Sequence, residues 1–132
     1  MSFILSTKKI EDVNVIYFEL MRLPSTGEIK QIASDLKTIV MSSETNYALY
    51  AIHSSKTKID FPSFEHFQVI LEVLRESKIL IATKLLGSII QVQKLDAATN
   101  LAKEMFLLVY RPLKPFTISQ STEESIQFLK EL

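Results

Sequence analysis

Chemically versatile side chains are concentrated in one stretch of this sequence. Both histidines of the chain fall there, together with several serines and an aspartate. The set is His53, Ser54, Ser55, Asp60, Ser63 and His66. Imidazole, hydroxyl and carboxylate groups can together move protons, activate a nucleophile or hold a small polar ligand. We name this set the candidate loop and predict that it is a regulatory or ligand-binding region.

Catalysis and metal binding at the candidate loop are disfavoured by what surrounds these residues. A serine hydrolase needs its nucleophile on a sharp turn beside an oxyanion pocket, often within Gly-x-Ser-x-Gly. The chain has two glycines, both far from these serines. The spacing of His53, Asp60 and His66 matches no recurring metal-ligand pattern. Residues 54–58 also lack the glycines of a phosphate cradle. We therefore expect no catalytic residue, no metal ligand, no cofactor and no enzymatic activity.

An apolar strand and a helix must position the candidate loop. Residues 46–53 form an almost continuous apolar run, which is typical of a central strand covered on both faces. Pro62 suits the first turn of a helix, and apolar residues then recur at helical spacing. This helix could end near Ser77 or continue to Ala82. Open α/β folds place ligand and partner sites where such a strand ends.

Before this unit, we expect a short edge strand at residues 3–6, a polar turn ending in a tight reversal near Glu11, and a strand at residues 13–22. The strand face with Ile16 is wholly apolar and should be well buried, whereas the face with Val15 is mixed and should be partly covered. The expected core residues are Ile16, Phe18, Leu20, Leu36, Leu49, Ala51, Phe67, Leu71, Ile90, Leu101 and Met105.

Helices and strands alternate through the rest of the chain. Ser25 and Glu28 form a capping box that begins a helix. Strands are expected within residues 85–93, with a break at Gly87, and at Phe116–Ser119. A helix at residues 96–110 separates these strands. A second capping box, Ser121 with Glu124, begins a final helix, in which Ile126, Leu129 and Leu132 are expected to point inward. This order predicts an α/β fold with a mostly parallel five-stranded sheet flanked by about four helices.

Composition indicates one ordinary globular domain over residues 1–132. Apolar residues make up 47% of the chain and charged residues 23%, as in typical soluble domains. Fifteen basic and fifteen acidic side chains give a net charge of zero, which disfavours nucleic acid as a partner. The absence of cysteine excludes disulfides. Without a signal peptide or an apolar run of about 20 residues, we expect a cytoplasmic protein with no transmembrane segment.

A second candidate site lies where the helix expected at residues 96–110 ends. Phe106 and Leu107 fall outside its inward stripe, and Tyr110, Arg111 and Lys114 follow. Aromatic and arginine side chains often anchor interfaces, so this group, named the candidate interface, could bind a protein partner or a second copy as a homodimer. The alternative is a helix end with cations placed against the helix dipole.

Three stretches resemble the STAS domain, the fold of anti-sigma-factor antagonists and of the cytoplasmic tails of sulfate transporters. Asn14–Leu20 and the capped helix after it are similar to the family's opening strand and first helix. Tyr47–Phe67 is similar to its central strand, loop, Ile-Asp pair and helix start, and Pro115–Ile126 to its closing strand and helix. The resemblance implies a STAS-like fold and a non-enzymatic regulatory role exercised through protein partners.

The residues after Asp60 depart from the switch loop of that family. The family's loop reads Asp-Ser-Ser/Thr-Gly, with a phosphorylatable serine directly after the aspartate. Here Phe61 and Pro62 follow Asp60, and the glycine is absent. Ser63 is expected to serve as an ordinary helix N-cap rather than as a replacement phosphorylation site.

Two functions from different classes remain open. The first is a non-enzymatic regulatory or protein-interaction domain of STAS type, which acts by partner binding or self-association. The second is a small-ligand binding module or minor enzyme, with a pocket near His53 and Asp60 that holds a nucleotide, a lipid or a small acid.

Overall fold

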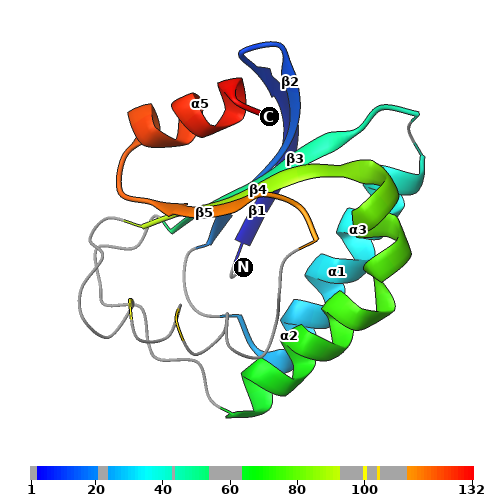
Figure 1. Ribbon diagram of the computed structural model, residues 1–132. Coiled ribbons are helices and arrows are strands. Elements are labelled where there is room, and N and C mark those ends of the chain that lie inside the picture. Colours follow the sequence, from blue (N-terminus) through cyan, green and yellow to red (C-terminus); the bar gives the residue numbers. More distant parts are fainter. Residues whose placement is uncertain are drawn as a thin grey trace.

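The computed structural model of the chain (Figure 1) describes residues 3–20, 24–42, 44–53, 64–92 and 113–132, with Asn100 and Glu104 between the last two ranges. Its elements, in order, are β1 (Phe3–Ile10), β2 (Val13–Leu20), α1 (Thr26–Met41), β3 (Tyr47–His53), α2 (Phe64–Glu76), α3 (Lys78–Lys84), β4 (Leu85–Gln91), β5 (Phe116–Ser119) and α5 (Thr122–Lys130). The expected α/β architecture is confirmed: the described elements are five strands and four helices.

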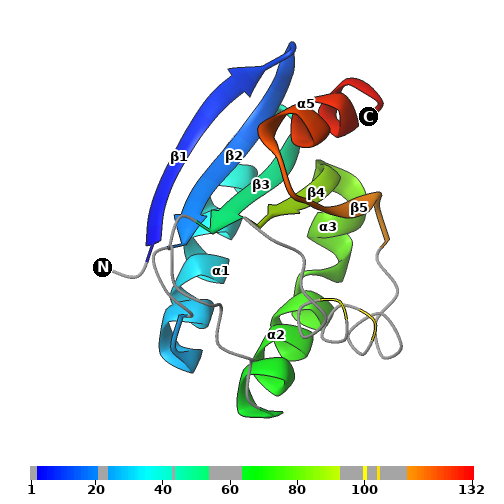
Figure 2. The ribbon, with the colours of Figure 1, turned by 90° about the vertical axis from the view of Figure 1, so that its left-hand side faces the viewer.

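The five strands form one mixed sheet in the order β1-β2-β3-β4-β5. β1 is antiparallel to β2, and β2 to β5 run parallel. Parallel crossovers are right-handed, and the two described crossovers step in the same direction along the sheet, so their helices belong on one face. Figure 1 shows α1, α2 and α3 on that face and α5 on the other, and Figure 2 shows the strands side by side.

The N-terminal hairpin is longer than the sequence suggested. We expected a strand at residues 3–6 and a polar turn from residue 7 to residue 12, but β1 continues to Ile10, which pairs directly with Val13. The tight reversal at Glu11 and Asp12 is confirmed, with φ of 50° and 64°. Two consecutive positive φ values are typical of a type I′ turn, which needs just two residues and so lets the strands pair up to its edge.

The helix after β3 combines both of the endings considered from its sequence. α2 ends at Glu76, Ser77 forms a turn, and α3 continues to Lys84. The Ser77 N–H donates to the Val73 carbonyl at 3.0 Å, and the Ile81 N–H donates to the Ser77 carbonyl at 2.9 Å. The two helices therefore follow one another across a junction at which helical hydrogen bonds persist.

The central packing lies on the face of the sheet that α5 covers. Val15, Ala48, Tyr50, Ile89 and Leu129 form a buried cluster there. We expected this mixed face of β2 to be the less covered one, which was wrong. The physical reason is that α5 places the fully buried Leu129 against it.

The other face contains most of the core that the sequence predicted. Ile16 and Ala51 are buried as expected. Five others, Phe18, Leu20, Leu36, Leu49 and Leu71, are half-buried. Ile90 was predicted wrongly, since 37% of its surface is exposed. Strand side chains alternate, so Ile90 points away from the face on which Ile89 is buried. The side chain of Phe67, and Leu101 and Met105, lie outside the described residues.

Gly87 does not break β4, as its sequence had suggested, but allows a close approach. The strand runs through it, and a shift in register leaves Leu86 without a partner in β3. A Cβ atom at Gly87 would lie 2.8 Å from Leu132 Cδ2 and 3.1 Å from the Pro115 carbonyl oxygen. Leu132, expected to point inward, does place its side chain against Gly87 of β4, although 38% of its surface is exposed.

Candidate functional site

The candidate loop leaves the sheet at a central strand. His53 is the last residue of β3, the third of the five strands, and pairs with Leu20 of β2. α2 begins at Phe64. Ser54, Ser55, Asp60 and Ser63, and the side chain of His53, lie outside the described residues. The pocket expected near His53 and Asp60 therefore stays a prediction.

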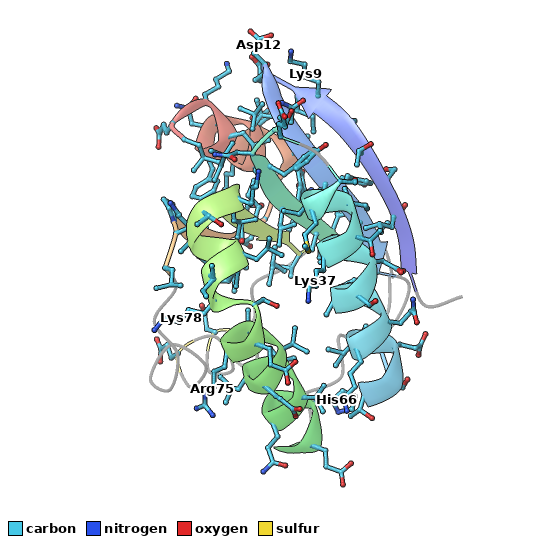
Figure 3. All side chains as sticks on the ribbon, turned by 90° about the vertical axis from the view of Figure 1, so that its right-hand side faces the viewer. Lys9, Asp12, Lys37, His66, Arg75 and Lys78 are labelled. Atoms are coloured by element: carbon cyan, nitrogen blue, oxygen red, sulfur yellow. The ribbon has the colours of Figure 1, made fainter. Side chains whose placement is uncertain are left out.

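His66, the one candidate-loop residue whose side chain is described, joins two helices. Its Nε2 atom lies 3.0 Å from the carbonyl oxygen of Pro24. Since a carbonyl accepts, Nε2–H donates, and the ring links the first turn of α2 to the residue before the N-cap of α1. Figure 3 shows His66 between these two helices. The imidazole thus has a structural partner 42 residues away in the sequence.

The start of α1, and with it the position of Pro24, is set by a capping box. The Glu28 N–H donates to Ser25 Oγ at 3.2 Å, and the Ser25 N–H donates to Glu28 Oε1 at 3.1 Å. These two bonds satisfy backbone donors that the first turn would otherwise leave unpaired. The predicted cap is confirmed, and it places the Pro24 carbonyl directly before the helix that His66 contacts.

The described topology supplies no switch-point crevice beside β3. Such a crevice forms where neighbouring crossovers leave the sheet for opposite faces. Here the crossover through α1 and the crossover through α2 and α3 lie on the same face (Figure 1). The expectation of a site at the end of β3 thus depends on the candidate loop rather than on a crevice between described elements.

A cavity lies elsewhere, between α1, the α2–α3 pair and β3. Its volume is about 110 Å³, and its walls are almost entirely apolar, with Leu36, Leu49 and Leu80 as examples from the three sides. Two polar residues, Lys37 of α1 and Ser77 of the α2–α3 junction, also line it. The sequence analysis missed this site. The signal for it in the sequence was Ser77, a serine at an inward helical position of an otherwise apolar stripe.

A buried polar network fastens α5 to the opposite face of the sheet. The side-chain oxygen of Gln91 accepts from the Tyr50 hydroxyl and from Ser125 Oγ, the latter at 2.9 Å. Gln91 Nε2 donates to Thr122 Oγ1 at 3.3 Å, and the oxygens of Ser119 and Ser125 lie 2.6 Å apart. Ser119 and Ser125 are almost fully buried. Because every member has a partner, the network stabilises the packing of α5.

An aromatic pair adjoins this network on the same face. The rings of Tyr17 and Tyr50 are 5.5 Å apart in an edge-to-face arrangement, and Lys8 Nζ lies 3.6 Å from the centre of the Tyr17 ring. Burial raises the pKa of the Tyr17 phenol, and the Glu19 carboxylate and Tyr50 add to this effect. The phenol is therefore held in its neutral form, in a cation–π contact with Lys8.

The candidate interface falls mostly outside the described residues. Phe106, Leu107, Tyr110 and Arg111 are not among them, and Lys114 is half-buried. The docking role of this group stays a prediction. Within the described ranges, no three His, Asp or Glu side chains are grouped as a metal site would require.

In the part of the chain that the structure describes, each helix is too short or too polar to cross a bilayer. A scan against protein-family models, a search of curated proteins and a search of solved structures each returned no match to this chain. Its function must therefore be argued from its own residues.

Proposed function

We propose that this chain is a STAS-type regulatory or protein-interaction domain, which binds a protein partner or a second copy of itself and catalyses no reaction. The observation that carries the proposal is the hydrogen bond from His66 to Pro24. It ties the element at which the candidate loop ends, α2, to the start of α1. The element from which the loop leaves, β3, is held by strands on both sides.

Binding residues are often found on loops that a rigid scaffold positions. Fixed attachment points reduce the conformational entropy lost when a partner docks, and so leave more of the contact energy for affinity. The use of His66 as a structural donor also favours a binding role over a proton-transfer role for this residue. The order of the described elements is consistent with what the STAS resemblance implies.

The surface beside the candidate loop offers a matched pair of test variants. Glu65 is exposed in the first turn of α2, and Glu123 is exposed in the first turn of α5, on the opposite face of the sheet. Reversing either charge removes a similar favourable interaction with a helix dipole. Glu65→Lys and Glu123→Lys should therefore change stability alike and differ in their effect on binding.

The experiment combines quantitative affinity capture with sedimentation velocity on the wild type and both variants. We expect the wild type to bind a protein or to form a dimer. Glu123→Lys should retain this binding, whereas Glu65→Lys should weaken it about tenfold, because a charge reversal at an interface disturbs its electrostatic complementarity. A wild type that stays monomeric at high concentration and captures no protein selectively would refute the proposal.

A further inference from the structure

We propose that the cavity between α1, the α2–α3 pair and β3 binds a small monocarboxylic acid, with its short apolar tail inside and its carboxylate at Lys37. This ligand site goes beyond the interaction role proposed above and does not depend on it. The described residues that line it belong to α1, the α2–α3 pair and β3, with Leu85 of β4, whereas the pocket expected from the sequence was near His53 and Asp60.

The size and lining of the cavity define the tail. An apolar cavity of about 150 Å³ is known to stay dry and to hold benzene. By the same measure, the cavity of about 110 Å³ has room for about four to five carbon atoms. A water molecule inside would find few polar partners along walls such as Leu36, Leu49 and Leu80. An apolar tail would gain the contacts that water cannot make.

The polar residues of the lining define the head group. Lys37 is exposed, and Figure 3 shows it on the side of α1 that faces α2 and α3. Within the described residues, it has no acidic partner. A carboxylate at the mouth of the cavity would supply that partner, whereas an ammonium group would be repelled.

Ser77 supports the same assignment independently. It lies at the junction of α2 and α3, across which helical hydrogen bonds persist. Here the side chain makes no capping hydrogen bond, although it lines the cavity. Its hydroxyl is thus available to donate to a carboxylate oxygen. Together, Lys37 and Ser77 present one cation and one hydroxyl donor above an apolar chamber, which suits a carboxylate with a short tail.

The test is a titration of the full chain, followed by NMR shifts of the backbone amides, with pentanoate, pentanol and pentylamine up to tens of millimolar. We expect pentanoate to bind most tightly, pentylamine least tightly, and all shifts to centre on residues that line the cavity. Lys37→Met should weaken pentanoate about two- to fivefold, the range expected for an exposed ion pair, and leave pentanol unchanged. Lys30→Met is the matched control, because Lys30 is an exposed lysine of α1 that does not line the cavity.

A second variant tests the chamber itself. Ala33 lines the cavity, so Ala33→Leu should fill it and abolish binding of both pentanoate and pentanol. The NMR spectrum of the variant also reports whether it remains folded, and Val40→Ala, which enlarges the cavity instead, should retain binding. Undisturbed cavity residues in the wild type, or equal pentanoate shifts in the wild type and a folded Ala33→Leu, would overturn the proposal.

Discussion

At the scale of single residues, His66 donates a hydrogen bond that joins α2 to the start of α1. Replacing it by alanine removes the donor to the Pro24 carbonyl and should lower the free energy of unfolding by about 0.5–1.5 kcal/mol. Urea denaturation measures the loss, and Gln68→Ala, an exposed position of the same helix, should change stability much less. If His66→Ala instead abolished a turnover measured on the wild type, the non-enzymatic proposal would be lost.

Tyr17 should make stability depend on pH at the alkaline end. Its pKa is raised in the folded state by burial first and then by Glu19 and Tyr50. The stability that the Tyr17 phenol contributes is therefore complete below the pKa of an unfolded tyrosine, about 10, and is lost as pH rises through the pKa of the folded state.

The measurement for Tyr17 is ultraviolet titration of the phenols together with denaturation at neutral and alkaline pH. Tyr17→Phe should remove a late-titrating phenol and reduce the loss of stability above pH of about 10. Tyr47→Phe should leave that late step in place. A late step that persists unchanged in Tyr17→Phe would show that another group is responsible.

At the scale of elements, the attachment of α5 depends on Gln91. Gln91→Leu leaves the hydroxyls of Tyr50 and Ser125 without their shared acceptor and should cost about 1–3 kcal/mol. Adding Tyr50→Phe to Gln91→Leu removes one stranded hydroxyl, so the double variant should lose less than the sum of the single losses. Strict additivity in urea denaturation would mean that the two side chains are not coupled.

At the scale of the whole molecule, the candidate interface predicts self-association. Phe106 is expected to point away from the sheet, with Arg111 and Lys114 beside it, so Phe106→Glu should convert a wild-type dimer into a monomer in sedimentation velocity. Ile79→Glu is the matched control, because Ile79 is 80% exposed on α3 and is not a member of the candidate interface. A monomeric wild type together with an unfolded Phe106→Glu would instead place Phe106 in the core.

Much of the fold could be predicted because its signals are local. Ser25 and Glu28 are three residues apart, and their capping bonds form within one helical turn. The short strand Phe116–Ser119 was likewise predicted with its observed bounds. The second cap was predicted in part: Ser121 caps the Glu124 N–H, but Glu124 accepts from Gln120 instead of from Ser121. Even here, the residue types did not show which of two adjacent backbone N–H groups, that of Gln120 or that of Ser121, would donate to Glu124.

The sequence by itself determined the order of elements, the helix caps and the mostly parallel sheet, because residue spacing and nearby hydrogen bonds decide these. The tertiary structure alone decided which sheet face receives α5, where His66 finds its acceptor, and where a cavity remains. His66 and Pro24 are 42 residues apart, and Tyr50 and Gln91 are 41 apart. Such partners meet only after the strands align and the helices pack, and a cavity between three elements depends on how closely their side chains fit.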